Sequence, residues 1–136
     1  MLRRALLLLI PLTACAAADP AQEILDRVTG MAASLSAGDV HGFMDAFDPA
    51  MPGYGKLRDY ITGLAEQGTV ESFVDVAEDE GNDRSRKVDL DWRLRIKRER
   101  DATAAAPRER RLKCRFEKQG KKWRVTALDP VDFFAP

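Results

Sequence analysis

The sequence predicts an α+β domain in which three N-terminal helices pack on a four-stranded antiparallel sheet. Three observations lead to this prediction. Apolar residues recur at helical spacing as far as Leu64, and from Thr69 onward they alternate with polar residues. Residues that favour turns, chiefly Gly, Pro and Asn, separate the periodic segments. A run of helices followed by a run of strands is typical of an α+β fold with the helices on one face of the sheet.

The first helix is expected to run from Asp19 to Gly38. Asp19 can cap this helix, and Pro20 suits the first helical position because its missing N–H would be unpaired there in any case. Apolar residues follow at the spacing of a buried helical face: Ile24, Leu25, Val28, Met31, Ala32 and Leu35. Gly38 can adopt the left-handed conformation that ends many helices.

Two shorter helices are expected next. Asp39 can cap the second helix, whose apolar face consists of Val40, Phe43, Met44 and Phe47. A loop rich in Pro and Gly spans residues 49–55. The third helix carries another apolar face, Leu57, Tyr60, Ile61 and Leu64, and Gly68 closes it.

Four strands are expected after Gly68. The first spans residues 70–78, and turn-forming residues at 80–83 lead into the second. The apolar residues of the second strand alternate with charged ones, so one face should be buried and the other wet: Val88, Leu90, Trp92, Leu94 and Ile96. A loop of small residues, 101–107, precedes a third strand with the same alternation. A hairpin turn at Gly120 then leads to a fourth strand with Trp123, Val125 and Ala127 on its inner face.

The N-terminal residues resemble a bacterial lipoprotein signal peptide. Arg3 and Arg4 precede an apolar run, 5–12, which is too short to span a bilayer, since spanning takes about 20 residues. The segment Leu12-Thr13-Ala14-Cys15 resembles a lipobox, in which the cysteine is lipidated and becomes the first mature residue. The alternative is an ordinary cleaved signal in which the cysteine is incidental.

The resemblance implies a signal peptide, 1–14, a lipidated tether, 15–19, and a single domain, 20–136. It also implies export and anchoring on the periplasmic side of a membrane through lipid on Cys15. Ala16 follows the cysteine where an aspartate would retain similar lipoproteins in the inner membrane. We therefore expect delivery to the outer membrane if the host has one.

Charge and cysteine content constrain the exported domain further. Residues 15–83 carry 3 Lys+Arg against 14 Asp+Glu, whereas residues 84–136 carry 17 Lys+Arg against 8 Asp+Glu. The two halves can attract each other within the fold, or they can mark an interaction surface. With Cys15 lipidated, Cys114 is the remaining thiol. A disulfide within the chain is then excluded, and the apolar core must stabilise the domain.

The order of elements is similar to that of the nuclear transport factor two-like superfamily, which includes ketosteroid-isomerase-like and polyketide-cyclase-like proteins. The resemblance covers residues 20–134. It rests on Ser36–Asp39 leading into Phe43–Phe47, on the long second strand, and on the closing hairpin Phe116–Val125 with its turn glycine and inward tryptophan. It implies a curved, cystatin-like sheet that wraps the helices into a cone around an apolar pocket. The superfamily contains enzymes, ligand binders and scaffolds, so the fold alone does not give the function.

The inward-facing residues are candidates for the wall of such a pocket: Phe43, Phe47, Tyr60, Trp92, Leu94, Leu112, Cys114, Phe116 and Trp123. A pocket with aromatic walls would suit an apolar ligand. Alternatively, these side chains fill the cone, because a small domain needs its large apolar residues for stability.

An enzymatic role would need other residues. His41, the only histidine, lies four residues before Asp45, so both fall on one helical face and could act as a general base and its orienting partner. Ketosteroid-isomerase-like enzymes pair an acidic base with a tyrosine or an acid as oxyanion donor. The nearby candidates for these roles are Asp45, Asp48, Tyr54 and Tyr60. None of these residues lies in a recognisable catalytic motif, and an exposed helical pair is the alternative. No cofactor is expected, and one histidine with one thiol predicts no metal site.

Strand alternation also predicts a basic outer face on strands two to four: Arg93, Arg95, Lys97, Arg111, Lys113, Arg115, Lys122 and Arg124. Three acids, Asp89, Asp91 and Glu117, lie between them on these strands. An exported protein is not expected to bind nucleic acid, so an anionic lipid, a glycan or a protein is the expected partner, with a solvated face as the alternative. Such a face would disfavour an apolar dimer, and we expect a monomer or a weak dimer.

Taken together, the sequence predicts a membrane-anchored envelope protein whose domain binds a ligand or partner without catalysis. The first alternative is a small enzyme of the ketosteroid-isomerase-like or polyketide-cyclase-like type with an aromatic pocket. The second is a purely structural protein of the envelope.

Overall fold

The computed structural model describes residues 19–98 and 107–136. Its helices are α1 (Pro20–Ser36), α2 (Val40–Met44), α3 (Tyr54–Gln67) and a final 3₁₀ helix, η1 (Val131–Phe134). Its strands are β1 (Gly68–Gly81), β2 (Ser85–Arg98), β3 (Arg108–Gln119) and β4 (Lys122–Asp129). The predicted signal peptide, Cys15 and most of the predicted loop 101–107 lie outside the described residues.

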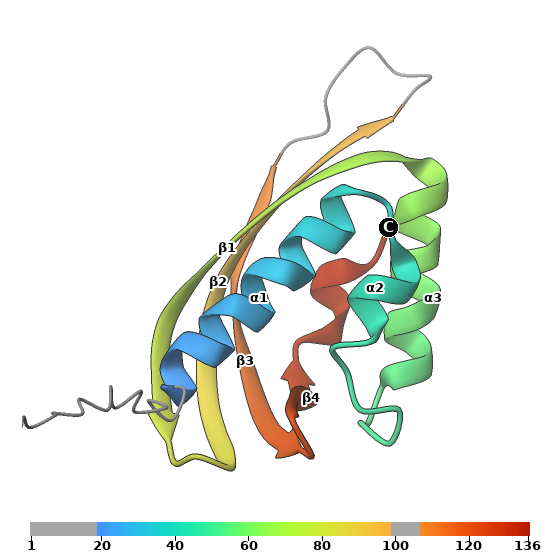
Figure 1. Ribbon diagram of the computed structural model, residues 1–136. Helices are drawn as coiled ribbons and strands as arrows, with labels where there is room; N and C mark the ends of the chain where they lie inside the picture. Colours follow the sequence, from blue (N-terminus) through green and yellow to red (C-terminus); the bar gives the residue numbers. More distant parts are fainter. Residues whose placement is uncertain (1–18, 99–106) are drawn as a thin grey trace, which may run out of the picture.

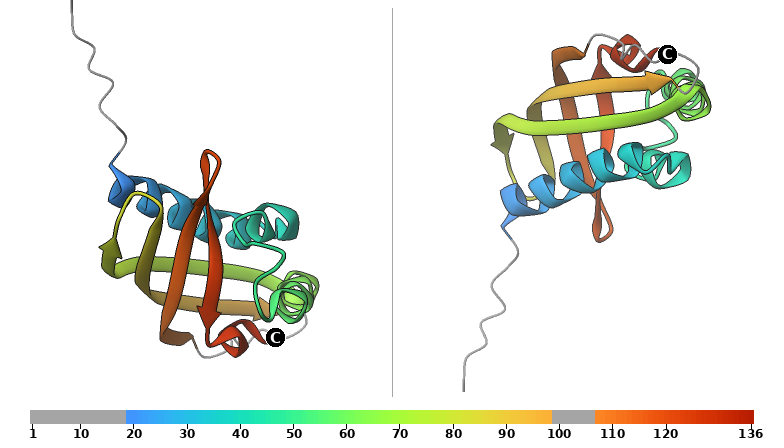
Figure 2. Two further views of the ribbon diagram at one scale, coloured as in Figure 1. Left: turned by 90° about the horizontal axis from the view of Figure 1, so that it is seen from below. Right: turned by 90° about the horizontal axis from the view of Figure 1, so that it is seen from above.

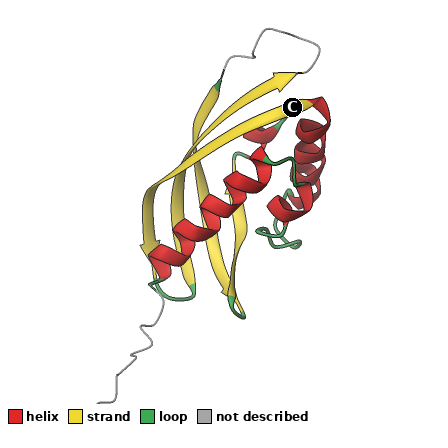
Figure 3. Cartoon of the chain, turned by 45° about the horizontal axis from the view of Figure 1, so that its top comes forward, coloured by secondary structure: helices red, strands yellow, loops and turns green. Residues whose placement is uncertain are grey.

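The four strands form one antiparallel sheet in the order β1-β2-β3-β4. The helices lie on one face of this sheet, with α1 running alongside β1 (Figures 1 and 3). The sheet twists strongly, so that β1 and β4 run in clearly different directions when the domain is viewed from below (Figure 2). The predicted α+β fold, with three helices on a four-stranded antiparallel sheet, is confirmed. The helix η1 after β4 is an addition that the sequence analysis did not foresee.

Side-chain caps fix where the first two helices begin. The carboxylate of Asp19 accepts a hydrogen bond from the Ala21 amide at 3.1 Å, and that of Asp39 accepts one from the Gly42 amide at 2.9 Å. Each cap satisfies an N–H that has no partner within its helix. Glycine at residue 42 leaves room for this cap, because a Cβ there would collide with the Asp39 carboxylate.

The core lies between the helices and the inner face of the sheet. The alternation predicted for β2 is observed, and its inward residues are all buried: Val88, Leu90, Trp92, Leu94 and Ile96. Trp92 lies at the centre, where its ring meets those of Phe43 and Phe134 edge to face, with centroid separations of 6.1 and 5.2 Å. The aromatic side chains of helices, sheet and C-terminal segment therefore pack directly on one another.

One predicted side-chain direction is wrong. Ala127 was expected on the inner face of β4, but it is exposed, and Leu128 is buried in its place. The reason is a register shift at Arg115 and Phe116 of β3, which pair with Ala127 and Val125 and leave Thr126 unpaired. Such a bulge inserts one residue and reverses the alternation beyond it.

The edge of β4 is covered by the segment that follows α2. The Asp48 amide donates to the Val125 carbonyl at 2.9 Å, and the Val125 amide donates to the Ala46 carbonyl at 2.8 Å. These bonds bring Asp45 and its neighbours to the side of β4, at the edge of the sheet.

Candidate functional site

Asp45, the acid singled out by the sequence, directly follows α2 and is surrounded by cations. Its carboxylate lies 3.5 Å from Arg27 Nη2, 3.6 Å from Lys122 Nζ and 3.9 Å from Arg124 Nη2. Arg27 comes from α1, and the other two come from β4. The side chain of Asp45 is 39% exposed, so the cluster is open to water on one side.

Arg27 is a residue that the sequence analysis missed. Its guanidinium donates to the backbone carbonyl of Asp45 at 2.8 Å and to that of Trp123 at 3.0 Å, in addition to its ion pair with the carboxylate. A planar guanidinium can satisfy several acceptors at fixed angles. Arg27 therefore joins α1, the end of α2 and β4, and the cluster around Asp45 has a clear structural role.

The cluster lowers the basicity of Asp45. Partial burial alone would raise the pKa of this carboxyl, but the charges of Lys122, Arg27 and Arg124 outweigh the effect and bring the pKa below its ordinary value. A general base works best when its pKa lies near the working pH. Asp45 is shifted in the opposite direction, which disfavours it as a base near neutral pH.

The structure does not bring the three catalytic candidates together. His41 and Asp45 line one small hollow of about 120 Å³, together with Phe47, Tyr54 and Arg124. Tyr60 lies elsewhere, where its hydroxyl donates to the Asp132 carboxylate at 3.2 Å. Lys56 pairs with the same carboxylate at 2.8 Å. Tyr60 therefore belongs to a contact between α3 and η1, and it is not available as an oxyanion donor beside Asp45.

Eight of the nine predicted pocket or core residues are buried: Phe43, Phe47, Trp92, Leu94, Leu112, Cys114, Phe116 and Trp123. The ninth, Tyr60, is only partly buried. The polar ends of both tryptophans have partners, since Trp92 Nε1 donates to Ser72 Oγ at 2.7 Å and Trp123 Nε1 donates to Glu23 Oε1 at 3.0 Å. Burial raises the pKa of the Cys114 thiol to about 12, so this cysteine is protonated at neutral pH.

The outer face of the sheet is less uniformly basic than the sequence analysis predicted. Strand β1 places four acids on the same face: Glu71, Asp75, Glu78 and Glu80. Glu71 pairs with Lys97 at 3.3 Å, and on the neighbouring strands Asp91 pairs with Arg111 at 2.9 Å. Lys122 and Arg124 contact Asp45 at the β4 edge. The count of three relieving acids was too low, because it left out the acids of β1 as well as Glu109 of β3 and Asp129 of β4.

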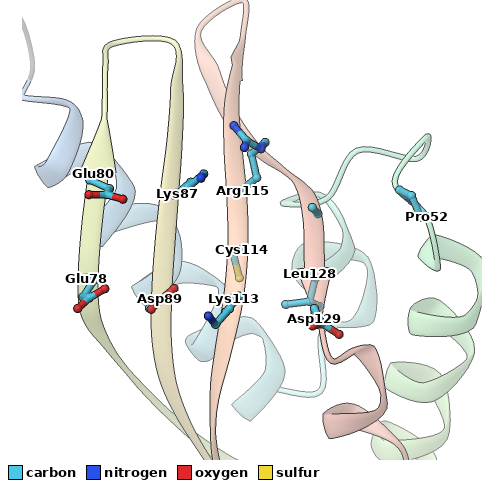
Figure 4. A pocket seen from close by; sticks show the side chains of 11 residues that line it. Pro52, Glu78, Glu80, Lys87, Asp89, Lys113, Cys114, Arg115, Leu128 and Asp129 are labelled. Carbon is cyan, nitrogen blue, oxygen red and sulfur yellow. The ribbon is translucent and has the colours of Figure 1, made fainter.

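A hollow of about 540 Å³ lies on this outer face, and we call it the outer-face hollow. Figure 4 shows it in front of the strands, with the helices behind them. Its charged walls come from β1, β2 and β3: Glu78, Glu80, Lys87, Asp89, Lys113 and Arg115. Ala127, Asp129 and Pro52 border it on the β4 side. Its volume lies within the range of small-molecule sites, about 300–1,000 Å³.

In residues 19–98 and 107–136, no three His, Cys, Asp or Glu side chains are grouped as metal ligands. No helix in the same residues combines the length and apolar character needed to cross a bilayer.

Comparison with solved structures identifies the fold. A candidate scytalone dehydratase from Novosphingobium aromaticivorans is similar, with a TM-score of 0.71 and 8% identity over 79% of this chain and 80% of the other. A candidate aromatic ring hydroxylase from the same organism has a TM-score of 0.68 and 12% identity, over 79% of this chain and 84% of the other. A nuclear transport factor two-like superfamily protein from Salmonella enterica serovar Typhimurium has a TM-score of 0.66 and 12% identity, over 80% of this chain and 87% of the other.

The chain has the nuclear transport factor two-like fold. The predicted resemblance of the domain is thereby confirmed at the level of structure. No model of a protein family and no curated protein sequence matches the chain. Other similar structures are proteins of unknown function, one of them with a cystatin-like fold. At these low identities the likeness concerns the fold, and the function has to be argued from the residues.

Proposed function

We propose that the protein is a lipoprotein of the cell envelope whose single domain binds a ligand or partner without catalysing a reaction. The observation that carries the binding role is the outer-face hollow, whose charged side chains converge on a volume suited to a small molecule. The interior supports the same proposal, because Phe43, Trp92 and Phe134 pack on one another at the centre of the domain.

The proposal includes a cone-shaped domain whose interior is occupied by its own side chains. Its support is the strong twist of the sheet around helices that lie on one face (Figure 2). A cone filled in this way leaves the outer surfaces for recognition. We propose the outer sheet face as the surface that meets a charged partner.

The membrane location rests on the sequence. Arg3, Arg4 and the apolar run 5–12 are followed by Cys15 at the lipobox position. Two or more acyl chains would hold the protein stably, since each buried CH₂ contributes ~0.8 kcal/mol. Anchoring would keep the domain at the periplasmic surface of a membrane, and the outer membrane is the proposed destination in a host that has two.

Cell fractionation tests the anchoring proposal. The wild-type chain should be recovered with membranes, whereas Cys15→Ser should be released as soluble protein or accumulate unprocessed. Cys114→Ser is the matched control, because this thiol is buried in the domain and its loss should leave the location unchanged. Membrane recovery of Cys15→Ser at the wild-type level and with a processed N-terminus would contradict the proposal.

A second candidate function is a small enzyme, and one observation favours it: His41 and Asp45 share a hollow at the β4 edge. The hollow measures about 120 Å³, which is less than ligand sites of about 300–1,000 Å³ provide. The lowered pKa of Asp45 also argues against a basic role. We therefore rank this candidate below the binding role.

A further inference from the structure

The outer-face hollow contains two neighbouring cross-strand rows that differ in charge. In the first, which we call the positive row, Lys87 of β2 lies directly opposite Arg115 of β3 on one side and directly opposite Glu80 of β1 on the other. In the second, the negative row, Glu78 of β1 lies directly opposite Asp89 of β2. Lys113 and then Asp129 continue the negative row across β3 and β4. Each row thus contains one pair of like charges on adjacent strands.

Like charges directly opposite each other destabilise a sheet. Among the described residues of the outer face, one such pair lies outside the hollow, Asp75 opposite Asp91, and there Arg111 pairs with Asp91. Arg93 faces Glu109, and their charged groups are 3.9 Å apart. Arg111 faces Asp91 and makes two hydrogen bonds to it, at 2.9 and 3.2 Å. Within residues 19–98 and 107–136, no comparable ion pair involves a side chain of either row. The charged side chains of the hollow are therefore left without an ion pair in these residues.

We infer that the outer-face hollow binds a small zwitterion, with its anionic group on Lys87 and Arg115 and its ammonium group on Glu78 and Asp89. Such a ligand would relieve both like-charge pairs at once. A simple anion would neutralise only the positive row, and a simple amine only the negative row. Charge complementarity therefore selects a ligand that carries both groups.

The strand geometry sets the length of this ligand. Lys87 and Asp89 are two residues apart on β2 and point to the same face, so the rows are about 7 Å apart at a rise of 3.2–3.4 Å per residue. Between the rows, β3 contributes Cys114, whose side chain points into the core, and on β4 the exposed side chain of Ala127 borders the hollow. This uncharged stretch suits a methylene chain that joins the two charged ends. The class is thus an ω-amino carboxylate or a compound of similar length and charge.

This inference deepens the proposed binding role and rests on it, but it does not depend on lipid anchoring. Ligand titration can therefore contradict the zwitterion inference without touching the anchoring proposal, and membrane fractionation can contradict anchoring without touching the inference. A domain that binds the zwitterion without being anchored would keep the inference and lose the membrane proposal.

The test is calorimetric titration of the full chain in a non-ionic detergent at low salt. The probes are β-alanine and 6-aminohexanoate, which differ in length, together with hexanoate and hexylammonium, which carry one charge each. We expect 6-aminohexanoate to bind about tenfold more tightly than each of the other three, and the affinity to fall as salt screens the charges. Equal affinities for 6-aminohexanoate and hexanoate, or no binding of any probe at millimolar concentration, would overturn the inference.

Variants locate the site. Lys87→Gln and Glu78→Gln each remove one charge of the two rows and should weaken 6-aminohexanoate binding about tenfold. Ala127→Phe should abolish binding by filling the hollow from an exposed position. The matched control is Lys97→Gln, which removes a cation from the same face outside the hollow. Binding that survives Ala127→Phe, or that falls equally in Lys97→Gln, would place the zwitterion elsewhere and refute the assignment.

Discussion

Trp92 gives the most direct test of a core filled by the protein's own side chains. Its side chain is 1% exposed, and its indole nitrogen donates to Ser72 Oγ at 2.7 Å. The rings of Phe43 and Phe134 contact it edge to face. If Trp92 instead formed the wall of an open pocket, truncating it would remove few contacts.

The structure sets the expected magnitude. Replacing a large buried aromatic residue with alanine costs ~3–5 kcal/mol. The Trp92→Ala variant loses two aromatic contacts, and the buried Ser72 hydroxyl loses its hydrogen-bond donor. Trp92→Ala should therefore cost about 5 kcal/mol, near the upper end of this range. That loss is comparable to the whole stability of a small domain, about 5–15 kcal/mol. The milder Trp92→Phe keeps a ring in place and should cost about 1–3 kcal/mol through the lost hydrogen bond and the smaller volume.

The assay is urea unfolding followed by far-ultraviolet circular dichroism, with stabilities taken from linear extrapolation. Phe73→Ala is the matched control, because this aromatic residue lies in the same sheet but is 56% exposed. It should lose less than about 1 kcal/mol, mostly from its contact with Arg93. A loss below about 1 kcal/mol for Trp92→Ala would refute the filled core and favour an open pocket.

Cys114 should resist thiol reagents until the domain unfolds, since it is buried with a pKa of about 12; fast labelling of the native protein would contradict this. Asp45→Asn should destabilise the domain at pH 7. Because the folded-state pKa of Asp45 is lowered, the ionised carboxylate contributes to the free energy of unfolding above the unfolded-state pKa. This contribution is lost as the pH falls through the folded-state pKa. A stability difference between variant and wild type that persists at low pH would contradict this prediction. Lys87→Gln should cost less stability than Arg111→Gln, because Lys87 faces the like charge of Arg115 as well as the opposite charge of Glu80, whereas Arg111 makes an ion pair with Asp91. An equal or larger loss of unfolding free energy for Lys87→Gln would show that Arg115 does not repel Lys87.

The layout of the fold was predictable because its patterns are local. Alternation from Val88 to Ile96 determines which face of β2 is buried, and the side chains of Asp19 and Asp39 mark helix starts through bonds that span two or three residues. The inward direction of Ala127 was not predictable. It depends on a bulge between β3 and β4, and the pairing of two strands leaves no periodic signal in either one.

The candidate site was predictable only in part, because its contacts join residues far apart in the sequence. Asp45 was noticed beside His41, but its partner Arg27 comes from α1 and also bonds to Trp123, 96 positions away. To predict the charge pattern of the outer-face hollow, one must know the pairing register of β1 with β2 and of β2 with β3. Alternation shows which residues point outward, and the register decides which charges face each other.

Mass spectrometry of the N-terminal peptide tests the central claim, that a ligand-binding domain is held at a membrane by lipid on Cys15. The protein would be purified from the membrane fraction of its native host and digested, and its first peptide would be sequenced. We expect a mature chain that begins at Cys15 and carries the mass of a diacylglyceryl group on the thiol and an acyl group on the amine. A chain that begins at Met1, or one cleaved elsewhere with an unmodified cysteine, would contradict the claim.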